Sequence, residues 1–96
     1  MAERTLIISV FSRNRQPREI NPIMEEMERL TESAGGEVAG RLVQKLDVPD
    51  SRTLLGRGKT QTLRELIKSE KADMVVFYNT LSRIQQRNLE IGRAHV

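Results

Sequence analysis

The chain of 96 residues is long enough for one small domain, and its 38% hydrophobic and 30% charged residues allow both a core and a polar surface. The absence of cysteine excludes a disulfide framework and a thiolate metal site, and the single histidine, His95, excludes a histidine-rich one, so we predict no metal site. The apolar runs are all too short to span a membrane, and we expect a cytoplasmic protein. A net charge of +3 permits a nucleic-acid partner without requiring one.

The first half of the chain predicts a strand, a basic loop, a helix and a second strand. Thr5–Phe11 is apolar and β-branched, as a strand buried on both faces would be. The polar loop from Ser12 to Arg18 follows it. Asn21–Pro22 then supplies an N-cap and a proline at the first helical position, and Gly35–Gly36 ends the helix. Glu37–Leu46 is predicted to be the second strand.

The second half continues the alternation of strands and helices. Its predicted elements are a turn at Asp47–Ser51, a short strand at Thr53–Leu55, a tight loop at Gly56–Gly58, a helix from Lys59 to Glu70, a strand at Met74–Tyr78, and a third helix opened by the capping-box pattern at Ser82–Gln85. Helices between apolar strands are typical of βαβ units. We therefore predict an α/β fold, a single small domain with a mostly parallel sheet flanked by helices.

Gly58–Lys59–Thr60 matches the end of a phosphate-binding P-loop, G-x-x-x-x-G-K-[ST]. Thr53 stands where that motif needs its first glycine, so we do not expect a true P-loop. A weaker hypothesis is that Gly56, Arg57, Gly58 and Lys59 attract an anion to the start of a helix. The alternative, which we favour for small-molecule binding, is a turn between strand and helix.

The loop after the first strand carries Arg13, Arg15 and Arg18, which could contact a phosphate backbone, and a solvated loop is an equally good interpretation. Loops that follow parallel strands gather at one edge of the sheet. These arginines could therefore form one patch with Arg57 and Lys59. We predict no catalytic residue, because the acids Asp47, Asp50 and Asp73 lie where capping and turn roles are expected.

The last six residues, Ile91–Val96, do not fit the third helix. One back-translation of them resembles a sequencing-adapter read-through. Our hypothesis is that the natural sequence ends at Glu90 and that 91–96 is a non-native tail, the alternative being an ordinary frayed terminus.

Four stretches in order resemble the N-terminal domain of the HflX-type ribosome-associated GTPases. They are AGGEVAGRLVQ at Ala34–Gln44, PDSRTLLGRGK at Pro49–Lys59, ADMVVF at Ala72–Phe77 and LSRIQQRNLE at Leu81–Glu90. Each is weak alone, and their order and spacing are specific. The sequence departs from the family pattern at Tyr78–Asn79, where an acidic pair is usual, at Arg83, where proline is common, and at Leu54, where an aromatic is common.

The resemblance implies that residues 1–90 are an N-terminal α/β domain, incomplete at its C-terminal end, of a modular protein. Such proteins bind the large ribosomal subunit and split or rescue ribosomes. GTP and magnesium would belong to a GTPase domain absent from this chain, so the chain would not be an enzyme by itself. Its expected partners are ribosomal RNA and protein and its own GTPase domain.

Two other classes of function remain as alternatives. A serine-recombinase catalytic domain would use Ser12 as nucleophile, with Arg13, Arg15 and the pair Arg83 and Arg87 stabilising charge. The stretch Pro49–Lys59 has no role in such an enzyme. The other alternative is a stand-alone α/β nucleic-acid-binding module.

Overall fold

The computed structural model describes residues 2–89 and 94–95. In chain order its elements are β1 (Arg4–Phe11), α1 (Pro17–Ser33), β2 (Glu37–Lys45), α2 (Arg57–Ser69), β3 (Met74–Phe77), α3 (Arg83–Leu89) and β4 (Ala94–His95). The strands pair in the order β2-β1-β3-β4, and each neighbouring pair is parallel. The predicted α/β fold with a parallel sheet is confirmed.

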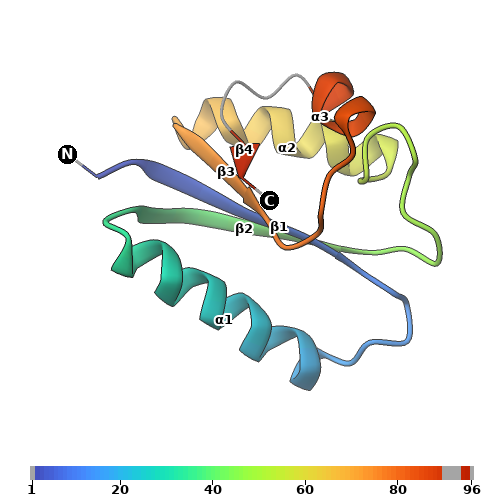
Figure 1. Cartoon of the computed structure of the whole chain (residues 1–96), viewed down its shortest axis with the longest axis horizontal. Coiled ribbons are helices and arrows are strands. Elements are labelled where there is room, and N and C mark those ends of the chain that lie inside the picture. Colours follow the sequence, from blue (N-terminus) through green and yellow to red (C-terminus); the bar gives the residue numbers. More distant parts are fainter. Residues whose placement is uncertain (1, 90–93, 96) are drawn as a thin grey trace.

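The sheet lies between two helical layers, with α1 on one face and α2 and α3 on the other (Figure 1). The central strand β1 is covered on both faces, and Leu6, Ile7 and Ile8 are completely buried. Leu6 and Ile8 join Leu63 of α2 and Phe77 of β3 in the larger core. On the opposite face, Ile7 belongs to a smaller core with Phe11, Ile20 and Met24. Thus the continuous apolar run of β1 reflects burial on both faces.

The first helix begins earlier than the sequence analysis predicted. It starts at Pro17 rather than after Asn21, so Arg18 is helical and Pro22 lies inside the helix. The true start has the same chemistry as the predicted one: proline is the first helical residue, and the Glu19 carboxylate accepts a hydrogen bond from the backbone N–H of Gln16 at 3.1 Å. Two sets of residues that favour a helix start, Gln16–Glu19 and Asn21–Pro22, lie next to each other here. A helix that begins at the first set also buries Ile20.

Two smaller predictions are also wrong. Thr53–Leu55 is not a strand, because only an isolated antiparallel bridge joins Asp50 to Leu54, and Leu54 has a positive φ of 68°. The helical spacing of Leu30 from Ile23 and Met27 predicts that it shares their apolar face, but Leu30 is 61% exposed. The helix end is as predicted, since Gly35 adopts a left-handed φ of 92° directly after the C-cap residue.

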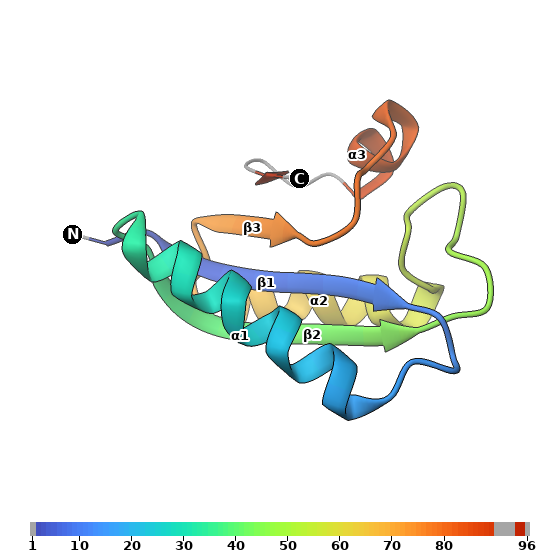
Figure 2. The same ribbon diagram turned by 60° about the horizontal axis from the view of Figure 1, so that its bottom comes forward.

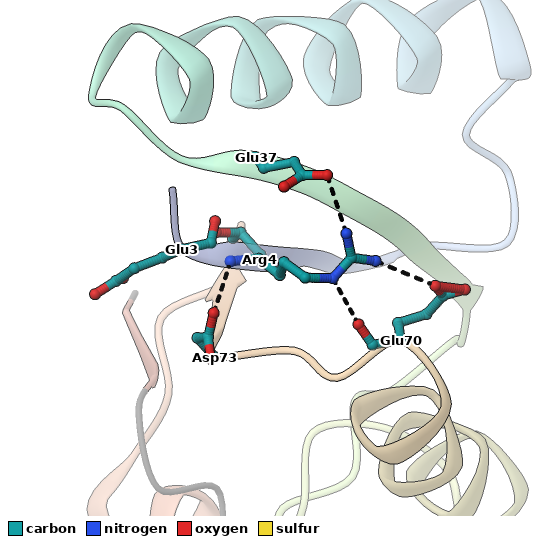
Figure 3. A network of polar contacts seen from close by, with 6 residues as sticks. Glu3, Arg4, Glu37, Glu70 and Asp73 are labelled. Atoms are coloured by element: carbon teal, nitrogen blue, oxygen red, sulfur yellow. Dashed lines mark hydrogen bonds and ion pairs between the residues drawn. The ribbon is translucent and has the colours of Figure 1, made fainter. Parts of the chain in front are cut away.

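Arg4 ties together the amino edge of the sheet, the edge where the parallel strands begin (Figure 3). Its guanidinium donates to the Glu37 carboxylate at 3.0 Å and to the Glu70 carbonyl at 2.7 Å. Its backbone N–H donates to the Asp73 carboxylate at 3.0 Å. These contacts join β1 to β2 and to the turn before β3, and they place acidic side chains at this edge.

The hypothesis of a non-native tail concerns residues of which 91–93 and 96 lie outside the described part of the chain. The structure describes Ala94–His95 as strand β4, beside Val75 and Val76 of β3. In the described part of the chain, none of the helices is long and apolar enough to cross a bilayer.

Candidate nucleic-acid interface

The loops after β1 and β2, which lead to α1 and α2, lie at the carboxyl edge of the sheet (Figure 2), and the basic residues singled out in the sequence belong to these loops or to the first turns of the two helices. The loop after β1 leads to α1 on one face of the sheet, and the loop after β2 leads to α2 on the other. The expected cations therefore share an edge but approach it from opposite faces. That they act as one patch stays a prediction.

The arginines in and after the loop that follows β1 differ in how easily a ligand can reach them. Arg15 lies over the buried Phe11 ring, 5.2 Å from its centroid, and pairs with Glu19 at 3.3 Å. Arg13 pairs with Asp47 at 3.3 Å, but both side chains are largely exposed, so this pair contributes little and a phosphate can replace it. Arg18, in the first turn of α1, is exposed. Arg13 and Arg18 are thus the cations of this group that a ligand can reach.

The loop between β2 and α2 does not have the open backbone of a P-loop, because the N–H groups from Arg52 to Gly56 already have acceptors within the protein. The Asp50 carboxylate accepts from the N–H groups of Arg52 and Thr53 at 2.7 and 3.1 Å. The next three N–H groups donate to the Asp50 carbonyl, the Thr53 carbonyl and the Gln44 side chain; they belong to Leu54, Leu55 and Gly56. A P-loop needs such donors free for a nucleotide phosphate, and these five are not free.

The four residues proposed for anion binding at the start of α2 have different roles. Gly56 is the N-cap, and its N–H is held by Gln44 at 2.8 Å. Arg57 and Gly58 are exposed, and Lys59 is half-buried. No side chain caps the helix. Arg57 is therefore the member of this group best placed to meet a ligand, with the helix dipole as a minor aid.

The sequence analysis missed two arginines that join Arg57 in one groove. Arg52, from the loop after β2, and Arg64, from α2, line a polar groove of about 390 Å³ together with Arg57, and we call it the arginine groove. Gln61 and Asn88 also line it. Arg57, Gln61 and Arg64 follow one helical face at spacings of four and three, so periodicity could have found Arg64. Nothing in the sequence placed Arg52 or Asn88 beside them.

The arginine groove carries an excess of positive charge. Among the ion pairs of the described residues, none includes Arg52, Arg57 or Arg64. The groove is lined by one carboxylate, that of Asp50, so its formal charge is +2, three arginines less one aspartate. The amino edge is different, because there Arg4 is balanced by Glu37 and Glu70. The arginine groove therefore presents a net positive charge beside the carboxyl edge.

Hydrogen bonds from α3 hold the wall of the arginine groove in place. Asn88 donates its side-chain N–H to the Arg52 carbonyl at 3.0 Å, and the buried Gln85 donates to the Asp50 carbonyl at 2.8 Å. Gln85 is itself fixed by the predicted capping box, in which Ser82 and Gln85 exchange side-chain-to-backbone bonds of 2.9 and 3.1 Å. Arg64 donates to the Asn88 carbonyl at 3.3 Å. The backbone of Arg52 is thus positioned before any ligand arrives.

Asp50 has the turn role that the sequence predicted, because its carboxylate accepts from two backbone N–H groups of the same loop. The backbone N–H groups of Arg52 and then Thr53 lower the pKa of its carboxyl below the ordinary value, and the charge of Arg52 adds to the effect. The carboxylate therefore stays ionised at neutral pH. Asp73 accepts from the Arg4 backbone, which is also a structural role.

The recombinase alternative gains no support from the neighbourhood of Ser12. Its hydroxyl donates to the Asn14 side chain at 2.6 Å, within the exposed loop after β1. Of the arginines invoked beside it, Arg13 pairs with Asp47 and Arg15 with Glu19. No general base contacts this hydroxyl among the described residues.

Comparison with known proteins identifies relatives for most of the chain. Residues 21–93 match a family described as the N-terminal domain of GTP-binding GTPases. Proteins named GTPase HflX are 32% identical over 91% of this chain in Flavobacterium psychrophilum, 40% over 79% in Alkalihalophilus pseudofirmus and 40% over 70% in Thermofilum pendens. The aligned parts cover 21%, 18% and 16% of those proteins, so the chain spans about a fifth of the relatives' length.

Proposed function

Because the chain belongs to the HflX family of GTPases, as an N-terminal domain of that family, we propose that it docks the parent protein on the large ribosomal subunit. The relatives are named as GTPases, and the family resemblance of the four sequence stretches implies a ribosome-bound protein that splits or rescues ribosomes. The observation that carries the proposal is the family match together with reachable cations at one edge: Arg13, Arg18 and Arg57. Arginine forks match the geometry of RNA phosphates.

The proposal assigns GTP chemistry to the part of the parent protein outside this chain. This assignment is supported by the loop resembling a P-loop, in which the backbone N–H groups from Arg52 to Gly56 are bonded within the protein. A GTPase domain joined to this one would bind GTP and magnesium in the cytoplasm. This domain would be its partner and would transmit nucleotide state to the ribosome.

Co-sedimentation with purified large ribosomal subunits across a salt series tests the docking. Two double variants, Arg13→Gln/Arg18→Gln and Arg57→Gln/Lys59→Gln, each remove two cations. Arg15 is left in place because it packs over Phe11. If each removed cation neutralises one phosphate, each double variant should weaken binding and reduce the log–log salt slope by about 1.5 to 2.

The control Lys68→Gln/Lys71→Gln makes the same charge change at the opposite end of α2. It should bind like the unmodified chain. If both test variants have the same affinity and salt slope as the unmodified chain, the carboxyl edge is only a solvated surface. The proposal that these cations dock the domain on the ribosome would then be wrong.

A further inference from the structure

We propose that the arginine groove is a binding site for the sugar–phosphate backbone of an unpaired RNA strand. The inference rests on the proposed function and deepens it by naming the site and the part of the RNA that the site contacts. Its basis is the convergence of Arg52, Arg57 and Arg64 from two separate segments on one groove of about 390 Å³.

The three guanidinium groups are available for an anion. Arg52, Arg57 and Arg64 are exposed, and within the described part of the chain their side chains make a single hydrogen bond, from Arg64 to the Asn88 carbonyl at 3.3 Å. That contact engages one nitrogen of five-donor Arg64. Each arginine therefore keeps donors for a phosphate, and none of the ion pairs of the described residues has to be broken first.

The spacing of the three arginines favours an RNA strand as the ligand over a small anion. Arg57 and Arg64 are two helical turns apart, roughly 10 Å along the axis of α2, and Arg52 faces them from the loop. A single inorganic phosphate contacts only part of this row, whereas a strand presents successive phosphates along it. Gln61, Thr53 and Asn88 add neutral hydrogen-bonding groups that suit ribose hydroxyls.

The groove reads the backbone rather than the bases. The residues that line it include no aromatic side chain on which a base could stack. Binding should consequently be tolerant of sequence and strongly dependent on salt. The fixed position of the loop, clamped through Gln85 and Asn88, reduces the ordering that binding requires.

Fluorescence anisotropy with labelled ten-nucleotide oligo(U) and oligo(A) tests the proposal on this chain. The test variant Arg52→Gln/Arg64→Gln leaves the residues of the ribosome-docking variants unchanged. It should raise the Kd about tenfold at low salt and reduce the salt slope by about 1.4, for two lost contacts to a single strand. Oligo(U) and oligo(A) should bind similarly.

The control is again Lys68→Gln/Lys71→Gln, and thermal melting confirms that all variants fold. Equal Kd and slope for the groove variant and the control would overturn the proposal. Displacement of the RNA by poly-glutamate at equal charge concentration would assign the groove to acidic peptides and also overturn it. Because the probe is a short oligonucleotide, failure of ribosome co-sedimentation with intact oligonucleotide binding would contradict only the docking function.

Discussion

At the scale of single residues, Asn79 shows why this chain departs from the family pattern without losing the sheet. Its side-chain oxygen accepts from the Val10 N–H at 2.8 Å, and its side-chain nitrogen donates to the Val10 carbonyl at 3.0 Å. The amide thus extends the pairing between β1 and β3 beyond Phe77. An acidic residue could accept from Val10 but could not donate when ionised.

Asn79→Asp should therefore destabilise the domain by about 1 to 3 kcal/mol, since it loses one hydrogen bond and brings a negative charge beside the Val10 carbonyl. Urea unfolding measures the change. Thr80→Asp, which adds the same charge at the neighbouring exposed position, should have a much smaller effect. Equal losses for the two variants would show that charge, and not the lost donor, is responsible.

The glycines separate into two kinds that sequence alone could not distinguish. Gly35→Ala should cost about 1 kcal/mol because its φ of 92° is unfavourable for a residue with a Cβ. Gly36→Ala should cost more, since a Cβ there would lie 2.9 Å from Thr31 Cγ2 and 3.2 Å from the Thr31 carbonyl oxygen. Gly58→Ala, in open space within α2, should stabilise by up to about 1 kcal/mol. Thermal unfolding of the three variants checks this order, and a destabilised Gly58→Ala would contradict it.

The ionisation of Asp50 predicts a pH dependence of the loop before α2. Its folded-state pKa is lowered by the N–H groups of Arg52 and Thr53, so its stabilising contribution is present above the unfolded-state pKa and is lost as pH falls through the folded-state pKa. An NMR titration should show a carboxyl pKa below the usual aspartate value. The Arg52 and Thr53 amide signals should move with it. An ordinary or raised pKa would mean that these two bonds do not form in solution.

At the scale of the elements, β1, β2 and β3 were predictable from the sequence, whereas the loop containing Thr53–Leu55 was wrongly predicted to hold a strand. The apolar runs of β1 and β3 identified buried strands because parallel strands are covered on both faces. The start of α1 was predicted wrongly because Gln16–Glu19 and Asn21–Pro22 both carry start signals, and packing of Ile20 against β1 favours the first. The path of Arg52–Gly56 was not predictable, since it depends on Gln44, Gln85 and Asn88 from distant segments.

The same dependence on long-range contacts decides which residues of the arginine groove could be predicted from the sequence. Arg57 was found because it begins a helix after a glycine, and Arg64 shares its helical face. Arg52 joins them only through the fold of the loop, which Asn88 fixes from α3. Long-range contacts of this kind leave no local pattern in the sequence.

The loop before α2 also predicts the result of a nucleotide assay. Purified chain should show no GTP turnover above a buffer blank and no GTP binding that depends on Lys59, because the backbone donors from Arg52 to Gly56 are already used. Lys59→Ala should therefore change neither measurement. Turnover that follows the protein through purification would move GTP chemistry into this domain and contradict the proposal.

At the scale of the whole molecule, the two edges of the sheet differ in charge. The amino edge carries the network of Arg4 with Glu37, Glu70 and Asp73, where acids balance the cation. At the carboxyl edge, the ion pairs of the described residues include none of Arg52, Arg57 and Arg64, and one carboxylate, Asp50, lines the groove with them. Such a difference in charge between two ends of a domain orients the domain toward a polyanion. It favours approach to RNA with the carboxyl edge leading.

We propose that this domain carries an HflX-type protein to the large ribosomal subunit through the carboxyl edge. The most direct test of this proposal is co-sedimentation of the chain with purified large and small subunits, measured side by side at the same salt concentration. The proposal predicts that the chain sediments with the large subunit, that the Arg57→Gln/Lys59→Gln variant does so less, and that the small subunit retains much less chain. Equal retention by both subunits, or none by the large subunit at low salt, would contradict it.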